Sequence, residues 1–356
     1  MTPSNTSSGM GRQSGLSMIE LLVALAIGSF LIIGAVTLQS QSRRNFDVGE
    51  QQARLQEAAR YVIATIEPDL QLAGVYGYSQ DPSSVLWYNN GALTSPSLLH
   101  TAMARAPGLP DTLATCGPNF AVNVLSTVAA TNGAFDLICA AQGGGAVAGT
   151  DLLVMRHSAP GRQDASVSKL QVYSERLAAQ TATRIFLSDT PPDPLLDGQR
   201  EVRDMVVQAY YIATNAVNRP GVPALRVKLL TSDAGVPQFV DQEVIRGVED
   251  LQVQFGVDPG DDINGDGTPD DLNANGMADF VNGRAAQYVN AGDPLLNSAQ
   301  VVAVRIWVRV RAEAPERGFT DNRTYQYADI QPFTPNDNFR RVLISRTIYL
   351  RNSRQH

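Results

Sequence analysis

The chain has 356 residues, which suits one large domain with an appended segment or two small domains. An apolar fraction of 44% excludes wholesale disorder, and a formal net charge of -7 disfavours a general nucleic-acid-binding surface. Seven aspartates, with no Lys or Arg among them, lie between Asp258 and Asp279, so the acidity is a local feature that needs a local explanation.

The N-terminal segment predicts a membrane span. Residues 1–15 are polar, residues 16–36 form an apolar run, and no residue from Leu21 to Ser42 is charged. As a helix, residues 16–36 would measure about 32 Å, enough to cross a bilayer core. A buried core helix is rarely apolar on every side, and a secretory signal peptide has a shorter apolar region and a small-residue cleavage site. Glu20 lies within the run, where a charge is costly, so we treat it as a functional candidate.

The apolar run begins with Gly15-Leu16-Ser17-Met18-Ile19-Glu20, a glycine and a hydrophobe followed by a glutamate at a fixed offset. This segment resembles the class III signal of type IV prepilins. The resemblance implies that a prepilin peptidase cuts between Gly15 and Leu16, that the new terminus at Leu16 is methylated, and that Glu20 becomes mature residue five. In a filament core of apolar helices, the terminal amine of a neighbouring subunit would offset the charge of Glu20. Leu16 replaces the phenylalanine usual in that family.

After Arg44 the pattern becomes amphipathic. Apolar residues recur at helical spacing at Leu55, Ala59, Val62 and Ile66, which predicts a helix packed on a domain core. We expect this N-terminal helix to span residues 16–73 and Pro68 to end or kink it. In pilins such a helix has one half in the filament core and one half on the head domain. Major pilins tend to carry a proline partway along this helix, and here none occurs between residues 16 and 67. The resemblance therefore implies a minor rather than a major subunit.

Two segments at the end of this helix resemble the PilW family of minor pilins. They are residues 59–66 and Leu70-Gln71-Leu72-Ala73-Gly74-Val75-Tyr76-Gly77. Gln71 and Tyr78 depart from the arginine and cysteine common there. The resemblance implies a non-enzymatic subunit that takes part in assembly or initiation of a type IV pilus, in a tip complex with other minor pilins. Its implied partners are minor and major pilins, the inner-membrane assembly platform and a tip adhesin. The implied location is the inner membrane, with a periplasmic C-terminal domain, and then the pilus.

Residues 74–356 form the predicted head domain. Alternation of apolar residues at 302, 304, 306, 308 and 310 predicts a strand with one buried face. Further candidate strands lie at residues 152–156, 184–187, 206–213, 225–230, 251–257 and 342–350, and Arg346 interrupts the apolar face of the last. An antiparallel sheet laid against the helix gives an α+β, pilin-like fold. Residues 79–150 read as loops that decorate the core.

Two cysteines, Cys116 and Cys139, are the chain's full complement. In an oxidising compartment they form a natural disulfide pair, and in the cytosol they would be two unrelated buried thiols. The resemblance to pilins favours the disulfide.

The acidic loop, residues 258–279, contains two matching nine-residue units. Each places oxygen ligands at its positions one, three, five and nine and glycine at position six; these ligands are Asp262, Asn264, Asp266, Asp270, Asp271, Asn273, Asn275 and Asp279. This is the opening half of a calcium loop without the glutamate at position twelve of an EF-hand, and it is similar to thrombospondin type 3 repeats. A solvated turn is the alternative. Because the carboxylates repel one another, we favour calcium binding.

Nothing in the sequence indicates catalysis. The histidines at positions 100, 157 and 356 lie in no recognisable catalytic or zinc-binding arrangement, and Gly143-Gly144-Gly145 lacks the residues of a phosphate loop. Two alternatives to a minor pilin remain. A minor pseudopilin of a type II secretion system shares the N-terminal signal and the head. A single-span periplasmic protein with a calcium-dependent binding loop would show no cleavage at Gly15.

Overall fold

A computed structural model of the chain describes residues 17–89, 92–94, 115–116, 119–120, 122–263, 269 and 281–352. The chain divides into two compact units, residues 1–53 and residues 54–356. The second unit contains the end of one long helix and the strands of the described residues.

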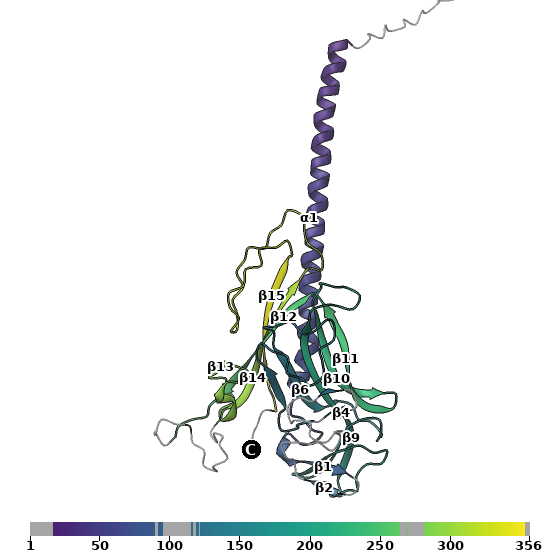
Figure 1. Ribbon diagram of the computed structural model, residues 1–356, viewed down its shortest axis with the longest axis vertical. Coiled ribbons are helices and arrows are strands. Elements are labelled where there is room, and N and C mark those ends of the chain that lie inside the picture. The colour runs from purple at the N-terminus through teal and green to yellow at the C-terminus, as the bar shows by residue number, and fades with distance from the viewer. Residues whose placement is uncertain are drawn as a thin grey trace, which may run out of the picture. The chain divides into compact units, whose positions relative to one another are not determined.

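Helix α1 runs from Met18 to Leu72 (Figure 1). Its buried residues begin at Leu55 and continue with Ala59, Val62, Ile66 and Leu70, so the predicted amphipathic face is confirmed. The expectation that Pro68 ends the helix is wrong. Pro68 lies inside it, and Leu70 in the following turn is fully buried, so packing of that turn outweighs the hydrogen bond that proline removes.

The residues after α1 fasten the helix to the sheet. Gly74 has a φ of 82°, and its N–H donates to the Arg156 carbonyl at 3.1 Å. The Tyr76 ring is fully buried, and its hydroxyl donates to the Val124 carbonyl at 2.9 Å. A Cβ on Gly77 would lie 2.4 Å from the Ser174 Cβ, in a left-handed conformation that favours glycine. The two glycines and the tyrosine of Gly74-Val75-Tyr76-Gly77 are therefore required by this connection.

The larger sheet has nine strands, in the order β11-β10-β9-β7-β8-β1-β2, with β5 and β6 attached beside β9. Its strands are β1 Val85–Asn89, β2 Ala92–Thr94, β5 Val128–Thr131, β6 Leu152–Ser158, β7 Gln171–Leu177, β8 Gln180–Phe186, β9 Gln199–Ala213, β10 Ala224–Asp233 and β11 Val236–Arg246. The 15-residue strand β9 is forked: residues 199–204 pair with β7 and residues 205–210 with β6. A short pair, β3 Thr115–Cys116 and β4 Asn119–Phe120, forms a separate two-stranded sheet, and Phe120 packs edge-on against Phe239 of β11.

The expectation that residues 79–150 form only loops is wrong in part. β1 pairs with β8 and β5 pairs with β6, so this region supplies strands to the larger sheet. The β1–β8 pair is parallel, whereas the other described strand pairs are antiparallel. A parallel pair needs partners distant in sequence, which local periodicity does not reveal.

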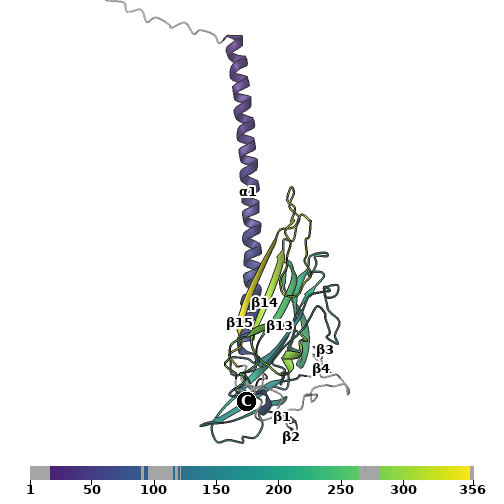
Figure 2. The ribbon, with the colours of Figure 1, turned by 90° about the vertical axis from the view of Figure 1, so that its left-hand side faces the viewer.

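The smaller sheet has the order β13-β12-β14-β15. Its paired strands β14 and β15 run alongside one another in Figure 2. Its strands are β12 Val248–Asp258, β13 Gln287–Asn290, β14 Gln300–Arg311 and β15 Arg341–Tyr349, and one-turn 3-10 helices occur at Pro82–Ser84 and Pro294–Asn297. The predicted apolar face of β14 is buried, which confirms that strand. Arg346, the interruption on β15, donates to Glu67 of α1 at 2.8 and 3.2 Å, so it reaches to the helix.

One core joins the helix to both sheets. The buried face of α1 from Leu55 to Leu70 packs in a single cluster with apolar residues of β6, β9 and β10 and of β12, β14 and β15. Asp151, immediately before β6, links the sheets: its N–H donates to the Leu251 carbonyl at 2.9 Å, and its carboxylate accepts the Val253 and Gly133 N–H groups, each at 2.7 Å. The α+β class with a long N-terminal helix is confirmed.

Candidate functional sites

Glu20 closes the first turn of α1. The Ser17 N–H donates to Glu20 Oε2 at 2.9 Å, and the Glu20 N–H donates to Ser17 Oγ at 3.2 Å. This reciprocal arrangement is a capping box, which satisfies two of the backbone donors at a helix start. Gly15 and Leu16, the expected cleavage residues, lie outside the described residues. The capping role of Glu20 follows from the Ser-x-x-Glu spacing, which sequence reasoning did not use.

The first half of α1 presents an apolar surface without cover from its own unit. Every large apolar side chain from Met18 to Leu38 is more than half exposed. Among the described residues α1 is the one helix long and apolar enough to cross a membrane, with a mean hydropathy of 2.6 over an 18-residue window of which none is buried.

The acidic loop connects β12 to β13. Of the eight predicted calcium ligands, Asp262 is described and exposed, and the other seven lie outside the described residues. The base of the loop is well defined. Val257 pairs with Gln287, and the buried Asp258 carboxylate accepts the Asn282 N–H at 2.8 Å, the Gly283 N–H at 2.7 Å and the Arg284 N–H at 3.3 Å. Asp258 therefore closes the loop at its neck, a role distinct from metal ligation.

Cys139 is disulfide-bonded. The side chain of Cys116, the chain's other cysteine, lies outside the described residues.

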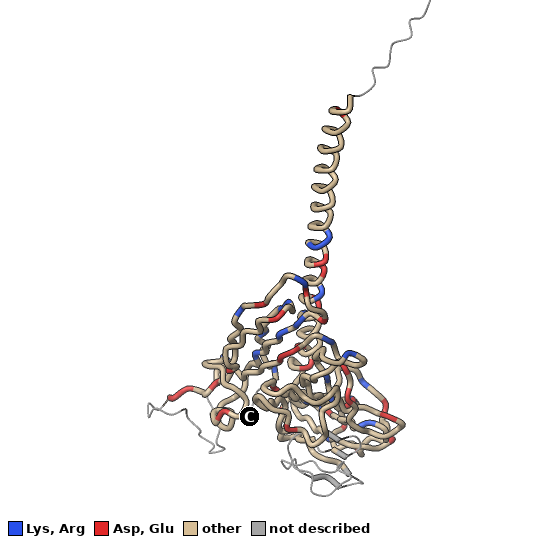
Figure 3. Tube along the Cα trace, turned by 45° about the horizontal axis from the view of Figure 1, so that its top comes forward, with Lys and Arg blue, Asp and Glu red and all other residues tan. Residues whose placement is uncertain are grey.

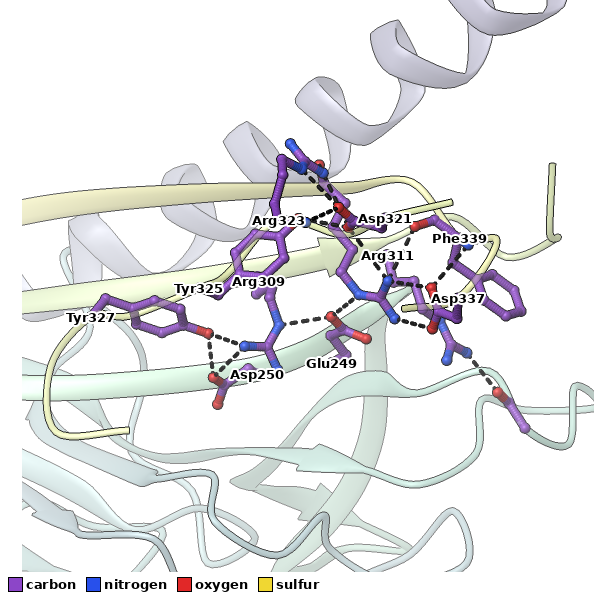
Figure 4. A network of polar contacts seen from close by, with 12 residues as sticks. Glu249, Asp250, Arg309, Arg311, Asp321, Arg323, Tyr325, Tyr327, Asp337 and Phe339 are labelled. Atoms are coloured by element: carbon purple, nitrogen blue, oxygen red, sulfur yellow. Dashed lines mark hydrogen bonds and ion pairs between the residues drawn. The ribbon is translucent and has the colours of Figure 1, made fainter. Parts of the chain in front are cut away.

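A polar network joins the smaller sheet to residues 312–340, which we call the strap (Figure 4). The strap forms isolated bridges, such as Asp321 with Asp337, but no strand. At the centre of the network Glu249 Oε1 accepts Arg309 Nε at 2.7 Å and Arg341 Nε at 2.6 Å. The Arg341 side chain is 2% exposed and Glu249 11%, so one carboxylate holds two buried guanidinium groups.

The strap supplies the remaining partners on one side of the network. Tyr327 donates its hydroxyl to Asp250, and Arg309 donates to the Tyr327 oxygen at 2.6 Å. Burial raises the pKa of the Asp250 carboxyl above its usual range, against the hydrogen bonds from Tyr327 and Gln252. The same burial, with Asp250 nearby, raises the pKa of Tyr327. Tyr327 is thus a neutral donor to a desolvated carboxylate.

On the other side the strap carboxylates meet arginines. Asp337 binds Arg341 through both oxygens, at 2.6 and 2.7 Å, and these hydrogen bonds lower the pKa of Asp337. Asp321 is buried, which opposes ionisation, but hydrogen bonds from Arg323 and Tyr325 hold its pKa below the usual range. These pairs are charge-assisted and partly bidentate, which makes their geometry specific.

The buried side chains of this network are arginines, carboxylates and tyrosines that bind one another. In the described ranges no group of three His, Cys, Asp or Glu side chains could hold a metal ion. His157 is 1% exposed; its Nδ1 lies 2.9 Å from the Ser158 carbonyl oxygen and its Nε2 lies 3.4 Å from Asp69 of α1. Sequence reasoning missed the strap network because its partners are far apart in the chain and have no periodic signal.

No curated protein matches the chain. A type IV-like pilin from Thermus thermophilus is among the similar solved structures, with 17% identity, a TM-score of 0.24, and coverage of 57% of this chain and 78% of that one.

Two family models match parts of the chain. The prokaryotic N-terminal methylation motif matches residues 10–36, which include the predicted cleavage position and Glu20. The type IV pilus-assembly protein W family, PilW, matches residues 209–352, from the end of β9 through the strap to the end of β15. Over residues 209–352 the chain is therefore similar to the PilW family of type IV pilus-assembly proteins, and over residues 10–36 to proteins with the N-terminal methylation motif.

Proposed function

We propose that the protein is a minor pilin that takes part in assembly and initiation of a type IV pilus, in a tip complex with other minor pilins. One observation carries this proposal: the methylation motif, residues 10–36, includes the first turns of a helix whose buried residues begin only at Leu55. In this proposal the turns before Leu55 lie first in the inner membrane and later among the helices of other pilins. Other minor and major pilins, the prepilin peptidase, the assembly platform and a tip adhesin are the proposed partners.

Glu20 has two roles in this proposal. In the single chain its carboxylate accepts the Ser17 N–H and closes the capping box. After cleavage before Leu16, the N-terminus lies one residue from Ser17, and the carboxylate faces the terminal amine of an incoming neighbour. A charge in an apolar filament core is costly unless it is paired, so pairing favours correct axial register.

The first test is the mass and N-terminal sequence of the protein recovered from membranes of cells with and without the prepilin peptidase. We expect a peptidase-dependent start at Leu16 that carries one extra methyl group. An intact Met1, or a cut after Val36, would contradict the pilin pathway.

Two substitutions separate the roles of Glu20. Glu20→Gln keeps an oxygen that accepts the Ser17 N–H but removes the charge, whereas Glu20→Ala removes both. We expect both variants to be cleaved and neither to assemble. Normal assembly of Glu20→Gln would show that capping rather than charge matters.

A deletion of the gene distinguishes the two kinds of assembly. Loss of twitching motility without loss of secretion supports a pilus, and the reverse result supports the secretion pseudopilin.

For the acidic loop we propose calcium binding. Its tandem nine-residue units support this, and the closed neck at Asp258 holds the loop's two ends together. Calorimetry of the full chain should show calcium binding that Asp266→Asn weakens and that Asp329→Asn, an exposed strap substitution, leaves unchanged. Absence of calcium-dependent heat would favour the solvated turn.

A further inference from the structure

The charge-free part of α1 has the length of a bilayer core. Leu21–Ser42 contains 22 residues without charge, which span about 33 Å as a helix against a core of about 30 Å. Glu20 lies at one end and Arg43 and Arg44 at the other. Figure 3 shows the long uncharged stretch of the helix, in tan, ending at a short blue segment of basic residues.

Three hydroxyl groups within this stretch are satisfied by the helix itself, and Gln39, Gln41 and Ser42 lie at its end. Ser29 donates its hydroxyl to the Ala26 carbonyl at 2.8 Å, Thr37 to the Ile33 carbonyl at 2.8 Å and Ser40 to the Val36 carbonyl at 2.9 Å. In lipid, where water cannot solvate polar groups, internal bonds of this kind are required. Because these hydroxyls are paired, the helix is suited to lipid as far as Leu38, and the polar residues 39–42 lead from there to the first arginine.

Arg43, Arg44 and Phe46 have the composition of a membrane interface. Both arginines are exposed, and no ion pair between described residues holds either guanidinium group. Phe46 is 71% exposed within a turn of both. Long cationic side chains extend toward headgroups while aromatic rings lie at the same depth, which anchors a helix at the membrane surface.

We propose that Arg43 and Arg44 bind the phosphate groups of phospholipids in the leaflet facing the head domain, with Phe46 at the same interface. This rests on the proposed membrane orientation. Guanidinium groups bind phosphate oxygens in a bidentate manner, so the pair fits phosphodiesters better than it fits neutral headgroups. The pair lies on the side where a charge-count rule disfavours basic residues, so it does not act as an orientation signal. It fixes the depth of the helix before the subunit is withdrawn into a filament.

Carboxylates of a partner pilin are the alternative ligand for the pair. The length match favours lipid, because the uncharged stretch measured from Glu20 places both arginines at the headgroup level without any partner protein.

The test uses the full chain in phosphatidylethanolamine–phosphatidylglycerol vesicles. Phe46→Trp introduces an indole whose quenching by phospholipids brominated near the headgroup or at mid-chain reports depth, with the native chain correcting for Trp87 and Trp307. We expect Phe46→Trp to be quenched mainly near the headgroup. Adding Arg43→Gln and Arg44→Gln should lower the headgroup-to-mid-chain ratio at least about twofold. Arg317→Gln, an exposed arginine of the strap, should leave it unchanged.

Three results would overturn the inference. An unchanged ratio in the double-Gln variant shows that the arginines do not set depth. An unchanged ratio together with lost co-purification with other pilins assigns them to a protein partner. Absence of quenching in every variant shows that the helix does not insert, in which case the proposed membrane span itself fails.

Discussion

The carboxylate of Glu249 offers the sharpest test of how the strap is held. It accepts hydrogen bonds from Arg309 of β14 and Arg341 of β15, and all three side chains are no more than 11% exposed. Glu249→Gln keeps the shape of the side chain and one acceptor oxygen but removes the negative charge. Two buried guanidinium groups then lose their shared counter-charge.

The expected cost is large for a single substitution. Removing one partner of a buried ion pair destabilises a protein by about 3–5 kcal/mol. Arg341 keeps Asp337 at 2.6 Å and Arg309 keeps the Tyr327 hydroxyl, so we expect the lower end, about 3 kcal/mol. For a unit spanning residues 54–356, an unfolding entropy of about 2.1 cal/mol/K per residue converts this to a fall in Tm of roughly 5 °C.

The assay is thermal unfolding of the purified chain in detergent, followed by circular dichroism. Glu313→Gln is the matched control: Glu313 pairs with Arg219 at 3.3 Å, but the two side chains are 42% and 56% exposed. An exposed pair contributes under about 1 kcal/mol, so the control should lose no more than about 2 °C. Equal losses in the two variants would refute the reasoning that burial gives Glu249 its importance.

Three further predictions concern the sheets. Burial raises the pKa of Asp151 to about 7, above an unfolded value of about 3.9, so the folded state disfavours the ionised carboxylate. The free energy of unfolding should therefore fall by up to about 1.4 kcal/mol for each unit by which the pH rises between pH 5 and 7. Denaturant unfolding at several pH values should show this fall in the native chain and not in Asp151→Asn. A Cβ on Gly256 would lie 2.8 Å from the Ala285 Cβ, so Gly256→Val should loosen β13, seen as faster amide exchange at residues 287–290 with unchanged exchange in β10. Arg346→Ala breaks an exposed ion pair with Glu67 and should lower the free energy of unfolding, measured with denaturant, by less than about 1 kcal/mol. A larger loss of stability would mean that this ion pair holds the helix to β15.

Local periodicity was sufficient for the elements whose burial repeats along the chain. The α1 face from Leu55 to Ile66 and the apolar face of β14 follow directly from spacings of 3.6 and two residues. The N-terminal signal was equally readable, because its residues are adjacent and their chemistry is specific.

What the sequence did not reveal depends on distant partners. β1 enters the larger sheet beside β8, almost 100 residues later, and Glu249 meets Arg341, 92 residues away. Such pairings arise when strands assemble, and a segment like the strap, which has no repeat of its own, reads as an ordinary loop. Arg346 appeared as a break in a strand pattern because its partner, Glu67, lies on the helix. The calcium ligands and the pairing of Cys116 with Cys139 stay predictions.

The neck at Asp258 makes the β12–β13 connection a candidate point for protein engineering. Because Asp258 ties residues 282–284 to the end of β12, the sheet is closed before the connection begins. Lengthening a loop whose ends are already held costs little, since the entropy of closure grows slowly with length. An epitope tag inserted between residues 268 and 271 should therefore leave the head folded, which thermal unfolding of the tagged chain would check.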